Sequence, residues 1–70
     1  MAQIKVYYDR KGNTLTVWLG NPQDECICEE TGDEVVLMKD AAGQVIGFER
    51  LNFSVGLSEP LGVAFEASAV

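Results

Sequence analysis

The chain has 70 residues, 47% of them hydrophobic, and a formal net charge of −6. This length predicts one domain over residues 1–70, and the hydrophobic content excludes a globally disordered chain. The acidic balance argues against direct binding to nucleic acid, which requires clustered Lys and Arg, but it permits a basic protein partner.

The sequence lacks the segments typical of secreted and membrane proteins. Its N-terminus has no apolar signal-peptide core, and no run approaches the roughly 20 apolar residues of a transmembrane helix. We therefore expect a soluble, cytoplasmic protein with no membrane partner. A domain of this size buries only about 60% of its unfolded surface. Two cysteines do not make a disulfide framework, and without histidine they supply few ligands for a metal site. We therefore expect a homo-oligomer, specifically a homodimer, in which a second subunit adds to the core.

The first predicted element is a β-hairpin over about residues 3–19. Its apolar residues alternate with polar ones and gather on one face: Ile4, Val6, Tyr8, Leu15, Val17 and Leu19. A four-residue loop over residues 9–12 places Val6 opposite Leu15 and keeps the aliphatic residues together. A three-residue loop would instead place Val6 opposite Thr16, so the hydrophobic pattern favours the longer loop.

The other face of this hairpin carries two aromatic residues and two threonines: Tyr7, Thr14, Thr16 and Trp18. An exposed aromatic patch is typical of a binding surface. We therefore predict a binding site at Tyr7, Thr16 and Trp18, with cover by the connector or the tail as the alternative.

An acidic connector follows the first hairpin. It places six carboxylates within eleven positions: Asp24, Glu25, Glu29, Glu30, Asp33 and Glu34. Like charges at this density repel one another, so we expect a solvated acidic face at the edge of a sheet. Calcium-binding loops alternate their acids around a central glycine, and that spacing is missing here.

Cys26 and Cys28 lie within this connector, where residues 26–28 predict a short strand. Residues two apart on a strand have Cα atoms about 6.6–6.8 Å apart, the outer limit for a disulfide. Zinc requires four ligands, and one chain offers two thiolates and no histidine. A homodimer would supply four thiolates. The alternative is two small buried residues in a reducing compartment.

The second predicted hairpin spans about residues 34–53, and its turn contains Asp40 and Gly43. Asp suits the first position of a type I turn, and Gly tolerates the left-handed conformation that closes the loop. The same Asp-x-x-Gly spacing occurs in the first hairpin. With residues 39 and 44 flanking the loop, Leu37 faces Ile46 on one side and Met38 faces Val45 on the other. Both faces are then apolar, so we expect the tail or a second subunit to cover the outer one.

The same register sets Glu49 opposite Glu34. Two facing carboxylates repel each other or share a proton when buried. Without a histidine, a nucleophile or a visible cleft, this pair is a weak basis for catalysis. We therefore predict no enzymatic activity, no catalytic residues and no cofactor, with a hydrolase using the acidic cluster as the least favoured alternative.

The C-terminal tail alternates Val63 and Phe65 with small or charged residues, which predicts a short last strand. A helix starting near Ser58 and Pro60 is the rival interpretation, and Gly62 weakens it. In either form we expect the tail to cover the outer face of the second hairpin with four apolar residues: Leu57, Leu61, Val63 and Phe65.

The order of these signals resembles domain-of-unknown-function family 2283. The resemblance rests on residues 8–9, 13–19, 35–37, 40–43 and 45–51 and covers about residues 4–53. Members tend to place acidic and alanine residues after the Tyr-Asp pair, where this chain has Arg10, Lys11 and Gly12, and the long tail differs as well. The family has no established activity, so the resemblance implies no catalytic residues. Some members are encoded beside small toxin-like proteins, which implies an antitoxin or accessory role.

Together these observations predict a mainly β protein: a small antiparallel sheet of two hairpins with an acidic connector and a short C-terminal strand. The predicted function is a non-catalytic protein–protein interaction module. The alternative is a metal-binding protein that uses Cys26 and Cys28 across a homodimer.

Overall fold

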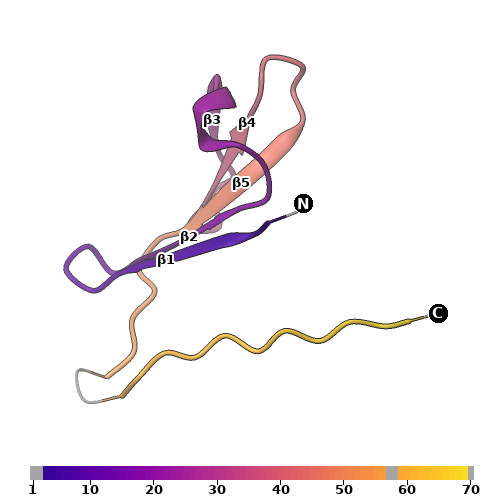
Figure 1. Cartoon of the computed structure of the whole chain (residues 1–70). Coiled ribbons are helices and arrows are strands. Elements are labelled where there is room, and N and C mark those ends of the chain that lie inside the picture. Colours follow the sequence, from indigo (N-terminus) through magenta and orange to yellow (C-terminus); the bar gives the residue numbers. More distant parts are fainter. Residues whose placement is uncertain (1–2, 57–58, 70) are drawn as a thin grey trace.

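The computed structural model describes residues 3–56 and 59–69 and shows one five-stranded antiparallel sheet (Figure 1). The strands are β1 (Lys5–Asp9), β2 (Thr14–Trp18), β3 (Ile27–Glu30), β4 (Val35–Lys39) and β5 (Val45–Arg50). Their order across the sheet is β1-β2-β5-β4-β3, so β1 and β3 are the edge strands. The mainly β class and the two hairpins are confirmed.

One short helix interrupts the connector between β2 and β3. It is a single 3-10 turn, η1 (Pro22–Asp24), capped by Asn21, whose side-chain oxygen accepts a hydrogen bond from Gln23 N at 3.0 Å. In the described part of the chain, no helix has the length and apolar character needed to cross a membrane.

The first hairpin forms with a loop that is displaced by one residue. Asp9 ends β1 opposite Thr14, so the four-residue loop is 10–13, and Val6 pairs with Val17. The predicted pairing of Val6 with Leu15 is therefore wrong. The cause is the Asp9 carboxylate, which accepts hydrogen bonds from two loop amides, while Asn13 takes the left-handed position at φ 56°. The apolar residues still share one face.

The turn of the second hairpin follows the predicted chemistry. Asp40 Oδ1 accepts hydrogen bonds from Ala42 N at 3.0 Å and Gln44 N at 2.9 Å. Gly43 has a φ of 82°, and its N–H bonds to the Asp40 carbonyl. Here the positive φ requires the glycine.

The register of the second hairpin differs from the prediction by two positions, for two reasons. The loop is one residue shorter than predicted, since Asp40 N donates to the Gln44 carbonyl. In addition, β5 contains a bulge, because Met38 pairs with Gly47 whereas Lys39 pairs with Val45. Leu37 pairs with Phe48 instead of Ile46, and Met38 pairs with Gly47 instead of Val45. Ile46 is the extra residue, and it shifts every pair beyond it by one position.

The two hairpins join where β2 pairs with β5. Val17 lies opposite Phe48, and Trp18 lies opposite Gly47. A Cβ atom at Gly47 would be 2.7 Å from Trp18 Cε3 and 2.9 Å from the Val17 carbonyl oxygen. The indole therefore packs against bare backbone, and this close approach requires glycine at position 47.

The pairing divides the side chains between two faces. The aliphatic face carries Val6, Tyr8, Leu15, Val17, Ile27, Val35, Leu37, Ile46, Phe48 and Arg50. The tryptophan face carries Tyr7, Thr16, Trp18, Cys28, Val36, Met38, Gly47 and Glu49.

The small core lies on the tryptophan face. Within the described ranges Met38, at 5% exposure, is the only buried apolar side chain, and Thr16, at 9%, is the buried polar one. Met38 follows Trp18 and Gly47 in one row across the sheet. The centre of the face that we expected the tail or a second subunit to cover is therefore already buried within one chain.

The tail does not form the predicted short strand. Residues 59–69 run as an extended trace apart from the sheet (Figure 1). Val63 is 70% exposed and Phe65 is 84% exposed, so neither covers the second hairpin. Leu57, also expected in that cover, lies outside the described residues.

Candidate functional site

The aliphatic face is an open apolar surface. Its central row runs through Val6, Val17, Phe48 and Leu37 on four adjacent strands. Apolar side chains on this face and its margins stay open to solvent: Ile4 at 58%, Val6 at 41%, Leu19 at 50% and Ile27 at 46%. Exposed apolar side chains on one face of a sheet are typical of interaction surfaces.

Charged groups border the aliphatic face on its β3 side. Lys39 Nζ lies 2.6 Å from Glu29 Oε2, and both residues project from this face. The pair is solvent-exposed, so it stabilises the monomer weakly. It gives the apolar surface a polar rim that carries both signs of charge.

A cluster around Tyr8 covers one corner of the aliphatic face. The Phe53 ring meets the Tyr8 ring edge-on, with centroids 5.8 Å apart, and the Arg10 guanidinium lies 5.4 Å from the Tyr8 centroid. The Tyr8 hydroxyl accepts a hydrogen bond from Val55 N at 3.0 Å, and Arg10 Nη2 donates to the Glu59 carbonyl at 3.2 Å. These contacts fix the start of the tail beside the β1–β2 turn.

The predicted binding residues Tyr7, Thr16 and Trp18 do share the tryptophan face, since Tyr7 pairs with Thr16. Their exposure differs. Tyr7 is 64% exposed, whereas Thr16 is buried and its hydroxyl lies 3.3 Å from Glu49 Oε2 as a hydrogen-bond donor. Trp18 is half-buried against Gly47. Of the three, Tyr7 offers the most surface to a partner.

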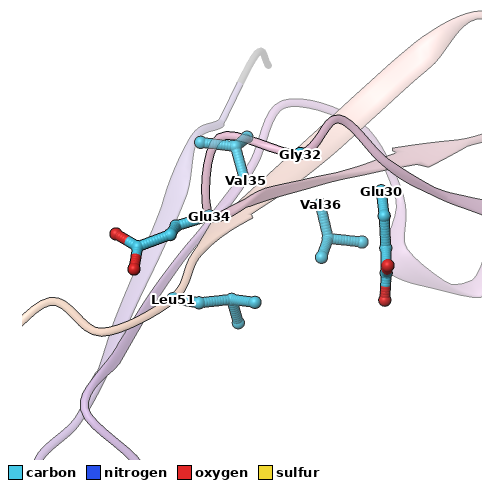
Figure 2. Close-up of a pocket in the computed structure, with 6 residues that line it drawn as sticks. All are labelled: Glu30, Gly32, Glu34, Val35, Val36 and Leu51. Carbon is cyan, nitrogen blue, oxygen red and sulfur yellow. The ribbon is translucent and has the colours of Figure 1, made fainter.

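A shallow hollow of about 150 Å³ lies beside the β3–β4 turn, lined by Glu30, Gly32, Glu34, Val35, Val36 and Leu51 (Figure 2). Figure 2 shows the side chains of Glu30, Val36 and Leu51 pointing to the same side, while the Glu34 carboxylate points away. Pockets for small ligands measure roughly 300–1,000 Å³. The hollow is therefore too small to enclose a typical cofactor, and no motif in the sequence indicates it.

Glu34 is held in an unusual conformation by its partners. Its φ is 61°, its carbonyl accepts a hydrogen bond from Leu51 N at 2.7 Å, and its carboxylate lies 2.7 Å from Arg50 Nη1. Asn52 Nδ2 donates to the other carboxylate oxygen at 2.9 Å. The hydrogen bonds from Arg50 and then Asn52 lower the pKa of Glu34 below its ordinary value. The predicted pairing of Glu34 with Glu49 is wrong, because Glu49 lies opposite Val36.

Replacing Arg50 with glutamine is expected to raise the pKa of Glu34 toward its ordinary value. A carboxyl group whose pKa is lowered in the folded state stabilises the fold above its unfolded pKa, and this contribution is lost as the pH falls through the folded pKa. The variant should therefore lose less stability than the parent on acidification. NMR titration of the Glu34 carboxyl carbon measures the shift. Lys39→Gln, which removes the other ion pair, is the control and should leave the Glu34 titration unchanged.

The acidic residues of the connector follow the β3 edge. Glu29 and Glu30 project to opposite faces of β3, and Asp24 belongs to η1. Among the residues that the structure describes, no three Asp, Glu, Cys or His side chains are grouped so as to hold a metal ion. The carboxylates along this edge deter strand pairing by another chain.

Both cysteines are exposed and free, so the alternative that they are buried is wrong. Cys28 lies in β3, and the Cys26 N–H bonds to the Lys39 carbonyl at 2.8 Å and extends the ladder. The Cys28 thiol donates to Glu25 Oε2 at 2.6 Å, and this bond raises the pKa of Cys28 above its ordinary value. A thiol kept protonated is a weaker nucleophile and metal ligand.

Comparison with known proteins gives one result. Residues 5–54, which include all five strands, match the family described as "Protein of unknown function (DUF2283)". No curated protein and no solved structure shows significant similarity to the chain. The match covers most of the sequence, and the chain therefore belongs to the DUF2283 family.

Proposed function

We propose that this protein is a non-catalytic protein–protein interaction module that works as a homodimer, with the aliphatic faces of two copies packed together. The supporting observation is the surface that one chain leaves open. Its accessible surface is 5546 Å² for a mass of 7.6 kDa. A compact monomer of that mass exposes about 4,300 Å².

The excess of roughly 1,200 Å² is more than the ~800 Å² that each partner buries in a standard protein interface. The extended tail contributes part of this excess, and the aliphatic face contributes exposed apolar side chains, among them Val6 and Ile27. Burying apolar surface is the main driving force for association. The size of the excess therefore supports a second protein surface over this sheet.

The composition of the face favours a second copy as the partner. Its centre is apolar, as homodimer interfaces are, and its rim carries Lys39, Glu29 and Arg50. A two-fold interface sets the same patch against itself. A rim with both signs of charge can meet itself without net repulsion, because a cation of one copy can face an anion of the other.

The acidic β3 edge is the surface for a different partner. It lies at the margin of the sheet, away from the centre of the aliphatic face, and the net charge of −6 favours a basic protein. An antitoxin-like or accessory role would use this edge. A homodimer would present it twice and so raise the avidity for a partner with two basic patches.

Sedimentation across a dilution series is expected to give a dimer that dissociates on dilution. Ile27→Glu should weaken the dimer at least tenfold, because it sets a carboxylate in an apolar interface. Cys28→Glu is the matched control. Cys28 is an exposed neighbour of Ile27 in the same strand, the charge change is the same, and its pairing with Met38 places it on the tryptophan face.

Two results contradict the proposal. The first is a parent protein that stays monomeric at millimolar concentration. The second is an equal loss of affinity in both variants, since that would trace to net charge and not to the aliphatic face.

A metal-binding homodimer is the second candidate, because Cys26 and Cys28 are both exposed at an edge strand. Metal analysis of protein purified without chelator separates the two candidates. Stoichiometric zinc, lost together with the dimer in a Cys26→Ser Cys28→Ser variant, would favour this alternative. A metal-free dimer that tolerates both substitutions would eliminate it.

A further inference from the structure

The two edges of the sheet are protected unequally. Glu29 and Glu30 give the β3 edge a row of negative charge, whereas β1 presents an edge strand with a single cation, Lys5. Ile4, Val6 and Tyr7 leave 58%, 41% and 64% of their surface exposed along that strand. Lys5 and Asp9 lie at the two ends of β1, and the residues between them carry no charge, so the middle of this edge is a template for another strand.

The C-terminal tail has the pattern of such a strand. Leu61, Val63 and Phe65 alternate with small or charged residues, and the segment is already extended. Val63 and Phe65 are among the most exposed large apolar side chains of the chain. Because this alternation has a period of two, one face of the segment is apolar over five residues.

We propose that residues 62–66 of one copy pair in antiparallel orientation with the β1 edge of a second copy, so that two copies exchange their tails. This inference rests on the proposed homodimer and names the contact that completes it. The register follows from charge. Glu66 is the only charged residue in 61–69, and setting it opposite Lys5 gives an attractive cross-strand pair.

The same register also matches the apolar residues. With Glu66 opposite Lys5, Phe65 lies opposite Val6, and Val63 lies opposite Tyr8. Both apolar residues of the tail then join the aliphatic face and extend it by one strand. A register shifted by one residue would move them to the tryptophan face and separate the two charges.

Exchange with a second copy explains why the tail stands apart in a single chain. Hydrogen bonds from Val55 to Tyr8 and from Arg10 to Glu59 fix its start at the β1–β2 turn. The segment that follows, residues 61–67, would span about 23 Å when fully extended, which is longer than the five-residue β1. It is therefore long enough to pair with the whole of β1 in a second copy.

Charge reversal tests the register. Lys5→Glu and Glu66→Lys are each expected to weaken the dimer by fivefold or more, and the double variant should return to within about twofold of the parent. Lys11→Glu makes the same charge change in the β1–β2 loop and is the control, with an affinity near that of the parent. The inference would be overturned by single variants whose dimer affinity equals that of this control, or by a double variant whose dimer is weaker than that of either single variant.

Disulfide trapping tests whether the contact is between copies. One chain carries Tyr7→Cys and the other carries Ala64→Cys, both in a Cys26→Ser Cys28→Ser background. The expected product of mild oxidation is a mixed disulfide dimer that neither chain forms alone in comparable yield. If a single chain with both new cysteines instead closes on itself at low concentration, the exchange is wrong.

The two proposals fail differently. A parent protein that is dimeric by sedimentation but gives no mixed disulfide and no charge-reversal effect keeps the aliphatic-face dimer and removes the tail exchange. A monomeric parent removes both.

Discussion

Replacing Met38 with alanine is expected to lower the free energy of unfolding by about 2–4 kcal/mol. Met38, at 5% exposure, is the only buried apolar side chain in the described part of the chain, and it lies in the row that contains Trp18 and Gly47. A core of this size supplies only ~3–5 kcal/mol. The variant should therefore lose most of its cooperative unfolding transition.

Urea denaturation followed by circular dichroism, at one fixed protein concentration, measures this effect, because stability and dimerisation are linked. Val45→Ala shortens an apolar side chain of the same sheet that is 44% exposed and should change stability by no more than about 0.5 kcal/mol. Equal losses in the two variants would mean that Met38 does not form the core.

Replacing Gly47 with alanine is expected to cost about 1–3 kcal/mol through overpacking. The new Cβ atom would be 2.7 Å from Trp18 Cε3 and 2.9 Å from the Val17 carbonyl oxygen. Either the indole or the β2 backbone must move, and both belong to the joint between the hairpins.

Fluorescence of Trp18, the one tryptophan in the sequence, reports that displacement directly. Gly56→Ala is the matched control, because a Cβ built there meets only the Glu59 side chain, at 3.7 Å, which is an ordinary contact. It should leave both stability and fluorescence unchanged. If Gly47→Ala behaves in the same way, the indole does not lie where the structure has it.

The hairpins could be predicted because their signals are local. Asp40 and Gly43 fix a turn through their own backbone and side-chain bonds, and alternation places the flanking residues on faces. The pairing across each hairpin could not be predicted. A displacement of two positions, such as Val6 moving from Leu15 to Val17, leaves every residue on its face, so the hydrophobic pattern cannot detect it.

The joint between β2 and β5 depends on contacts that the local pattern does not contain. Gly47, within an otherwise bulky strand, is the one residue that indicates a close approach, and it does not identify Trp18 as the neighbour. The bulge at Ile46 is also invisible in the sequence. Together with the shorter loop, it moved Glu49 away from Glu34, and Arg50 and Asn52 bind that carboxylate instead.

The candidate surfaces were also predicted only in part, because the local pattern does not contain the contacts between strands of different hairpins. Alternation correctly placed Tyr7, Thr16 and Trp18 on one face. It could not show that Thr16 is buried beside Glu49, because exposure depends on what the next strand contributes. The aliphatic face is the reverse case. Its residues form the most regular apolar pattern in the chain, and they remain uncovered because one layer of sheet has no second layer to pack against.

The strand order also has a consequence for how the chain folds. Each hairpin closes over a short loop, a process that takes roughly 1–10 μs in isolated hairpins. The β2–β5 joint instead brings together Thr16 and Glu49, which are 33 positions apart in sequence. Such distant contacts form slowly, since the chain loses conformational entropy before the contacts contribute any stabilising free energy. The two hairpins should therefore appear first as separate units, and their merger should set the rate at which the native sheet appears.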